Sequence, residues 1–118
     1  MRAIRGATCL QQDDAEEMRS AVVELLKEIF DRNQIANDDL VSVLFTSTPD
    51  LHCAFPAAAA RELELSDVPL ICAQEIDVHG AMPMTVRVMV HANIDVPRSD
   101  VKHIYLRGAQ VLRQDISQ

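Results

Sequence analysis

The stretch Thr85-Val86-Arg87-Val88-Met89-Val90-His91 has the clearest structural pattern in the chain, because every second residue is a valine. Successive side chains of a β-strand point to opposite faces, so the three valines share one face, while Thr85, Arg87 and Met89 share the other. The pattern predicts a strand with one face against a core. A charge in mid-strand is costly unless its face is open or the charge is paired, so Arg87 is a candidate functional residue.

Other strands and two helices are expected around this stretch. An amphipathic helix follows the N-cap candidates Asp13 and Asp14, with its apolar stripe at positions 18, 22, 25 and 29. Pro56 suits the first turn of a second, alanine-rich helix over Ala57–Leu65. Short segments rich in β-formers or alternating in pattern predict the remaining strands: Arg2–Cys9, Leu40–Thr48 (expected to be mostly buried), Val68–Ile76 and His103–Leu106. Gly108–Arg113 is expected to form a short final element.

This order of elements predicts one α+β or mixed α/β domain over residues 1–118, with a mixed β-sheet that carries both helices on one face. The short chain leaves little room for a deep pocket, so oligomerisation with a site at a subunit boundary is plausible.

Composition narrows the classes of function. The net charge is −7 and aromatic residues make up 3% of the chain, which argues against nucleic acid, since that ligand favours a basic face and stacking rings. No apolar run is long enough to span a membrane, and the N-terminus is not of signal type. The three cysteines, Cys9, Cys53 and Cys72, are odd in number and lack CxxC spacing, which favours free thiols and a cytoplasmic protein.

Two strand arginines are the main candidates for binding chemistry. Arg5 and Arg87 both lie in mid-strand, and two guanidinium groups facing one concavity would bind carboxylate or phosphate. Exposed or salt-bridged arginines on the strand surface are the alternative interpretation.

The other candidates are open to simpler explanations. Glu75, at a strand end, could be a general base, a hydroxyl acceptor, a counterion or only a solvated residue. Cys72 lacks a histidine at a diagnostic spacing, which favours an inert thiol over a nucleophile. Tyr105 could serve packing alone, and Phe55 could be a hydrophobic staple. The four scattered histidines give no metal-ligand pattern, and phosphate-binding and serine-hydrolase motifs are absent from the sequence.

Several blocks together resemble the monofunctional, homotrimeric chorismate mutases of mixed α/β architecture, as distinct from the all-helical kind. The resemblance runs from Ile4 to Arg113 and is weakest through the first helix. It is densest in these blocks: Thr48-Pro49-Asp50-Leu51-His52, Phe55-Pro56-Ala57, Arg61-Glu62-Leu63, Gln74-Glu75-Ile76-Asp77-Val78, Val86-Arg87-Val88-Met89 and His103-Ile104-Tyr105-Leu106.

The resemblance implies conversion of chorismate to prephenate without a cofactor or metal, in a homotrimer whose sheets form a pseudo-barrel core and whose sites lie at subunit interfaces. It implies that Arg87 contacts the ether oxygen and a carboxylate, and that Arg5 and Tyr105 hold the enolpyruvyl carboxylate. Glu75 would accept a hydrogen bond from the ring hydroxyl, beside Cys72. The remaining implied residues are Phe55, Ala57 and Arg61 from the adjacent subunit, and Leu112 and Arg113 in a mobile tail near the mouth of the site.

Two other functions remain possible for such a chain. One is a trimeric small-molecule-binding or imine-deaminase-type protein of similar architecture, because fold alone does not separate it from a mutase. The other is a non-catalytic sensor that uses its arginines to bind a dicarboxylate without turnover.

Overall fold

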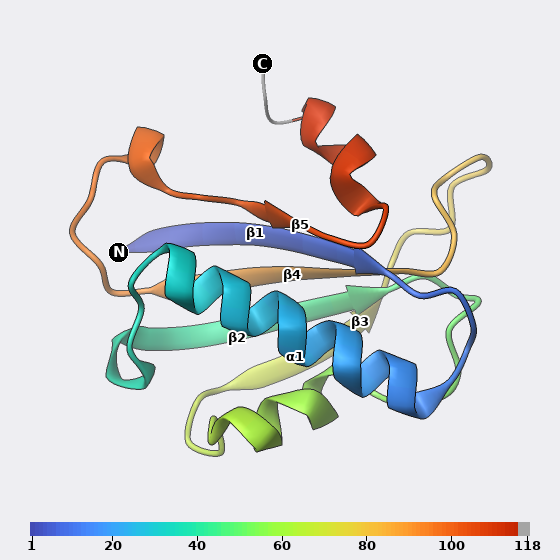
Figure 1. Cartoon of the computed structure of the whole chain (residues 1–118), viewed down its shortest axis with the longest axis horizontal. Helices are drawn as coiled ribbons and strands as arrows, with labels where there is room; N and C mark the ends of the chain where they lie inside the picture. The colour runs from blue at the N-terminus through green and yellow to red at the C-terminus, as the bar shows by residue number, and fades with distance from the viewer. Residues whose placement is uncertain (116–118) are drawn as a thin grey trace.

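Five strands form one mixed sheet in the order β3-β2-β4-β1-β5 (Figure 1). The computed structural model describes residues 1–115, and side chains up to residue 112. The central strand β4 is antiparallel to both β1 and β2, whereas the outer pairs β1–β5 and β2–β3 are parallel. The strands are β1 (Arg2–Cys9), β2 (Leu40–Ser47), β3 (Leu70–Gln74), β4 (Thr85–Ala92) and β5 (Ile104–Tyr105). The predicted mixed sheet is confirmed, and the valine stretch is its central strand.

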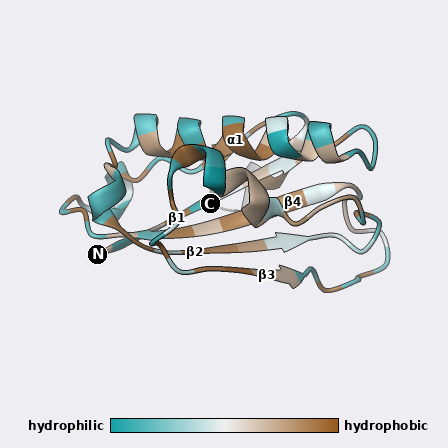
Figure 2. Ribbon diagram, turned by 90° about the horizontal axis from the view of Figure 1, so that it is seen from below, coloured by the Kyte–Doolittle hydropathy of each residue, from teal (hydrophilic) through white to brown (hydrophobic). Residues whose placement is uncertain are grey.

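The helix α1 (Ala15–Arg32) packs its predicted apolar stripe against the sheet (Figure 2). It begins after Asp14, whose carboxylate accepts a hydrogen bond from the Glu17 backbone N–H at 2.9 Å. The residues of the stripe are at most 1% exposed: Met18, Val22, Leu25 and Ile29. Close approach to the sheet requires glycine in β1, because a Cβ at Gly6 would lie 2.8 Å from Ile29 Cδ1.

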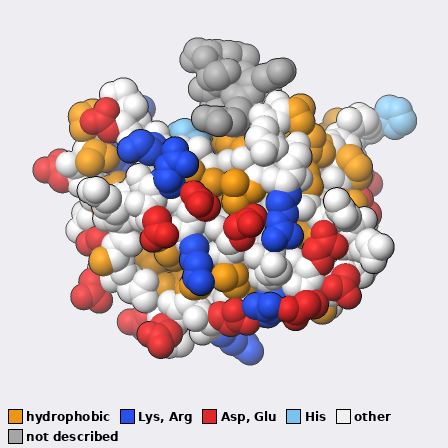
Figure 3. All heavy atoms as spheres, in the orientation of Figure 1, with side chains coloured by type: hydrophobic (Ala, Val, Ile, Leu, Met, Phe, Trp, Pro, Cys, Tyr) orange, Lys and Arg blue, Asp and Glu red, His pale blue; other side chains and the backbone are white. Residues whose placement is uncertain are grey.

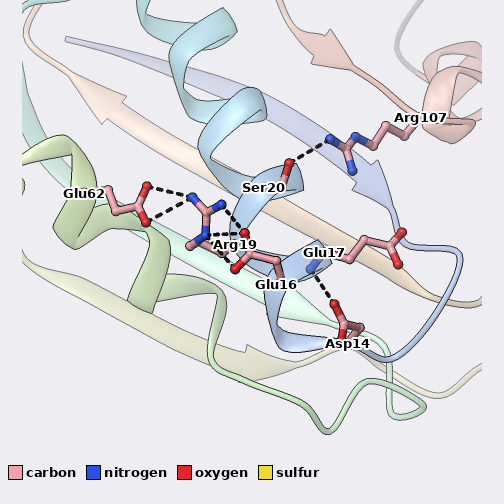
Figure 4. A network of polar contacts seen from close by, with 7 residues as sticks. All are labelled: Asp14, Glu16, Glu17, Arg19, Ser20, Glu62 and Arg107. Carbon is pink, nitrogen blue, oxygen red and sulfur yellow. Dashed lines mark hydrogen bonds and ion pairs between the residues drawn. The ribbon is translucent and has the colours of Figure 1, made fainter.

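The second helix differs in type from the prediction. It is a 3₁₀ helix, η2 (Pro56–Leu63), and Glu64 ends it in the left-handed region with φ of 59°. Alanine content favours a helix but does not select its pitch, and here buried Ala59 and Ala60 pack in the core that α1 covers. Arg19 of α1 also pairs with Glu62 of η2 at 3.0 Å (Figure 4).

Three short 3₁₀ segments complete the fold: η1 (Asn37–Asp39), η3 (Arg98–Asp100) and η4 (Ala109–Asp115). The face that carries α1 presents intermingled acidic and basic side chains to solvent (Figure 3). Within residues 1–115, no helix is long and apolar enough to cross a membrane.

The expectation that β2 is mostly buried is wrong. Val43 and Phe45 are at most 1% exposed in the core, but Leu44 between them is 38% exposed. Leu44 lies on the sheet face opposite α1, and Ile71, its register partner in β3, is 63% exposed. The strand resembles a fully buried one in sequence because both of its faces carry apolar residues. The sheet therefore has an open face that is partly apolar.

We expect Thr8→Val to stabilise the protein. Thr8 is fully buried in β1, and its hydroxyl has no hydrogen-bond partner among the residues described. A buried hydroxyl without a partner is unfavourable, and valine has nearly the same shape, so the free energy of unfolding should rise by about 1 kcal/mol. Urea unfolding of both proteins measures this change, and a lower free energy of unfolding in the variant would contradict the expectation.

Candidate active site

A cavity of about 220 Å³ lies on the open face of the sheet, over β1, β4 and β2. The strand register gathers its polar residues, because Arg87 lies opposite Ala7 of β1 on one side and Thr46 of β2 on the other. Arg5 of β1 lies opposite Met89 of β4, which is two residues after Arg87 and therefore on the same face of the sheet. The cavity, hereafter the cleft, is lined by Arg5, Gly6, Leu44, Thr46, Glu75, Arg87, Val88, Met89 and Tyr105.

Arg87 and Glu75 face each other in the cleft. Arg87 Nε lies 3.1 Å from Glu75 Oε1, and both side chains are partly exposed. The angles at this contact are not those of a hydrogen bond, so the buried Nε–H has no hydrogen-bond partner in the part of the chain that the structure describes. Thr46 Oγ1 instead donates a hydrogen bond to the same Oε1 at 2.7 Å. Arg87 therefore brings a positive charge and an unused donor to the cleft.

Tyr105 adds a second unused donor. It lies opposite Ala7 in the parallel pair of β5 and β1, and it is only 5% exposed. Its hydroxyl is buried and has no partner within residues 1–115. Buried polar groups are nearly always hydrogen-bonded, so an orphan hydroxyl beside two arginines indicates a place for a ligand acceptor.

His103 fixes the backbone that carries Arg5. Its Nδ1 accepts a hydrogen bond from the Arg5 backbone N–H at 2.9 Å, which joins the segment before β5 to β1. This bond requires an unprotonated Nδ1. Burial, and secondly the charge of Arg5, hold the pKa of His103 below its usual value. The neutral ring thus helps to place Arg5 and Tyr105 together.

A second group of candidate residues lies outside the cleft. Cys72 is opposite the buried Phe45 in register, so it faces the core side of the sheet, away from the face of Arg87. Phe55 is 74% exposed at the start of η2 and does not pack as a staple. These residues line another cavity, of about 580 Å³, formed by Phe55, Ala57, Ala58, Arg61, Leu65, Ser66, Leu70, Ile71 and Cys72. We call it the η2 surface.

The loop before η2 is anchored by Asp13. Its Oδ1 accepts hydrogen bonds from the backbone N–H groups of His52 and Cys53, each at 2.9 Å. Burial and then the hydrogen bond to Asp13 raise the pKa of Cys53 to about 11, which makes this thiol a poor nucleophile. In the described part of the chain, no three His, Cys, Asp or Glu side chains gather as metal ligands.

Of the two C-terminal candidate residues, the structure describes the side chain of only one. Leu112 lies in η4 and packs against the small cluster of Ala7, Tyr105 and Ala109, next to the cleft. The backbone of Arg113 lies in the same helix, but its side chain is outside the described residues.

Sequence reasoning missed Thr46 and His103 as parts of this site. Neither belongs to a motif with its own chemistry. The strand register of β2 against β4 is the one signal that could have placed Thr46 beside Arg87.

A small mixed α/β domain that presents two arginines, an unused tyrosine hydroxyl and a carboxylate to one cavity defines a protein with a binding site for a small anion. The family described as chorismate mutase type I matches residues 1–116. The chain belongs to this family.

Individual relatives agree with this membership. Chorismate mutase AroH of Bacillus subtilis (strain 168) is 42% identical over 118 residues, which cover 99% of this chain and 93% of the relative. Chorismate mutase AroH of Thermus thermophilus is 42% identical over 117 residues, with coverage of 98% and 96%. The solved structure of a chorismate mutase from Clostridium thermocellum matches with a TM-score of 0.92 and 44% identity, covering 94% of this chain and 99% of that one.

We expect the stability of the wild-type protein to fall more steeply in acid than that of His103→Asn. Because the pKa of His103 is lowered on folding, the unfolded state binds its proton more readily, so the stabilisation is complete above about pH 6.5 and declines as the pH falls below it. Asparagine keeps an acceptor near the position of Nδ1 but does not titrate. Free energies of unfolding at a series of pH values test this, and parallel curves for the two proteins would contradict it.

Proposed function

We propose that this protein converts chorismate to prephenate in the cleft, by a unimolecular Claisen rearrangement. In this reaction the ether C–O bond of chorismate breaks while a C–C bond forms, within one molecule and without proton transfer. The observation that carries the proposal is the buried, unused Nε–H of Arg87, beside the equally unused hydroxyl of Tyr105. This step belongs to aromatic amino acid biosynthesis, and we place it in the cytoplasm.

Arg87 acts on charge that exists chiefly in the transition state. As the C–O bond lengthens, negative charge develops on the ether oxygen, and a fixed guanidinium donor stabilises it without reorganising at that moment. Only an interaction that is stronger in the transition state than in the ground state accelerates the step. Arg87 should therefore affect kcat more than any other residue of the site.

Arg5 and Tyr105 bind the part of the substrate whose charge does not change. Together they would hold the enolpyruvyl carboxylate, so replacing them should raise KM more than it lowers kcat. Glu75 would accept a hydrogen bond from the ring hydroxyl. Its Oε1 already accepts from Thr46, and its second oxygen has no such bond among the described residues. These contacts would hold a chair-like conformer, which is the conformer that reacts.

The complete site requires a second subunit, in a homotrimer. One chain places Arg5, Arg87 and Tyr105 in the cleft, whereas Phe55, Ala57, Arg61 and Cys72 lie at the η2 surface. A neighbouring copy that covers the open face would bring its own η2 surface to the cleft and close it. The exposed apolar side chains of Leu44 and Ile71, which are register partners, support burial of this face, because covering them would remove apolar area from water.

Leu112 and Arg113 of η4 would border the mouth of the site in this arrangement. Cys72 would approach the ring carbons of the substrate only from the neighbouring subunit, because it does not face the cleft of its own chain.

We expect replacement of Arg87 by alanine to lower kcat by about 10²–10³ or more, by analogy with the loss of an oxyanion donor. Loss of chorismate absorbance in steady-state assays gives kcat and KM. Arg61→Ala is the comparison, and its kcat should fall far less. Similar losses in the two variants would contradict the ranking.

Two further replacements of Arg87 separate charge from shape. Arg87→Lys keeps the charge but lacks the planar fork of donors, and citrulline has the shape of arginine without its charge. A normal rate with citrulline would refute the electrostatic role. Saturable chorismate binding without turnover in the wild type would indicate a sensor instead of an enzyme.

We expect two impaired variants to recover activity when their subunits mix in one trimer. Arg87→Ala damages the cleft, and Arg61→Glu damages the η2 surface. In a mixed trimer, some sites combine an intact Arg87 with an intact Arg61 from the neighbour. Activity recovered after joint refolding would support the shared site. A monomer by light scattering, or no recovery from mixed trimers, would contradict it.

A further inference from the structure

Thr46 lies next to both members of the Arg87–Glu75 ion pair in the cleft. Strand β2 runs between β3 and β4, and the register places Thr46 opposite Arg87 on one side and Ala73 on the other. Its hydroxyl donates to Glu75 Oε1 at 2.7 Å, a short bond to an ionised acceptor. The same oxygen is the atom nearest to Arg87 Nε in the ion pair, at 3.1 Å.

An arginine and a carboxylate this close would ordinarily form a forked, doubly hydrogen-bonded pair. Here they do not, because Arg87 Nε makes no hydrogen bond within residues 1–115 although Oε1 is within reach. The Thr46 hydroxyl is bonded to that oxygen, and this bond restrains the direction in which the carboxylate points. A forked pair would use donors of Arg87 and would partly neutralise its charge.

We propose that Thr46 is a positioning residue, which holds the Glu75 carboxylate so that Arg87 keeps a free donor for the ligand. The inference rests on the proposed function, since its consequence is measured on the rearrangement. Thr46 itself need not touch the substrate. It acts through Glu75, so its effect must depend on the presence of that carboxylate.

Two replacements distinguish the hydroxyl from the shape of the side chain. Thr46→Val is nearly isosteric and β-branched, so it preserves strand geometry while removing the donor. We expect kcat to fall about tenfold, as for the loss of a hydrogen bond to a charged group, with a smaller change in KM. Thr46→Ser keeps the hydroxyl and should retain most of kcat.

A double-mutant cycle with Glu75→Ala tests the mechanism. If Thr46 acts through Glu75, adding Thr46→Val to Glu75→Ala changes kcat no further. If Thr46 only supports the sheet, the valine replacement lowers kcat by the same factor in both backgrounds, and the proposal is overturned. A normal kcat in the Thr46→Val single variant would also overturn it.

Thr8→Val is the matched control. It is the same substitution in the neighbouring region of the sheet, but Thr8 is buried on the core side, away from the cleft. Its kcat should equal that of the wild type. A wild-type protein that does not turn over chorismate would refute the proposed function itself, whereas turnover with an additive cycle would refute only the role of Thr46.

Discussion

The pairing of β4 between β1 and β2 is the constraint on which the site depends. Its antiparallel register brings Ala7, Arg87 and Thr46 into one row across the sheet, and the next step brings Arg5 beside Met89. A slip of β4 by one residue would turn Arg87 and Met89 to the opposite face, away from Arg5 and Thr46. The three valines of β4 are buried, and this prevents the slip. A slipped strand would expose the valines and place the charged Arg87 in the core. The hydrophobic core therefore also sets the geometry of the anion site.

A single chain leaves apolar side chains of the open sheet face exposed to water. Helix α1 and η2 cover only one side of the sheet, which leaves Leu44 and Ile71 in water on the other. On that side the cleft holds Arg5, Arg87 and Tyr105, but the η2 surface is separated from it. Covering the face with another copy would remove apolar area from water and complete the cleft in one event. In the proposed trimer, assembly and ligand binding would therefore be linked, since each would stabilise the other.

Local sequence pattern predicted what depends on short-range periodicity. The valine alternation of β4 and the stripe of α1 follow from spacing, and the N-cap of α1 is one of the two aspartates proposed for it, Asp14. The open face of β2 was not predicted, because apolar residues on an open face give the strand the composition of a core strand. The pitch of η2 depended on tertiary packing of its alanines, and the place of Cys72 and Thr46 depended on strand register between distant segments. The roles of Arg5, Glu75 and Tyr105 came from family resemblance, since spacing left them ambiguous.

An acidic chain with a net charge of −7 can still bind a dianion because the relevant field is local. At physiological salt the Debye length is about 8 Å, so distant surface carboxylates contribute little in the cleft. Among the described residues that line the cleft, the charged ones are Arg5 and Arg87 against one carboxylate, Glu75, and a partly buried pair is screened less than exposed charges. Some surface charges are also compensated by neighbouring residues, as in the network of Arg19 with Glu16 and Glu62 (Figure 4). By the proposal above, Thr46 on β2 holds the orientation of Glu75, and this orientation would set how much positive field the ligand meets.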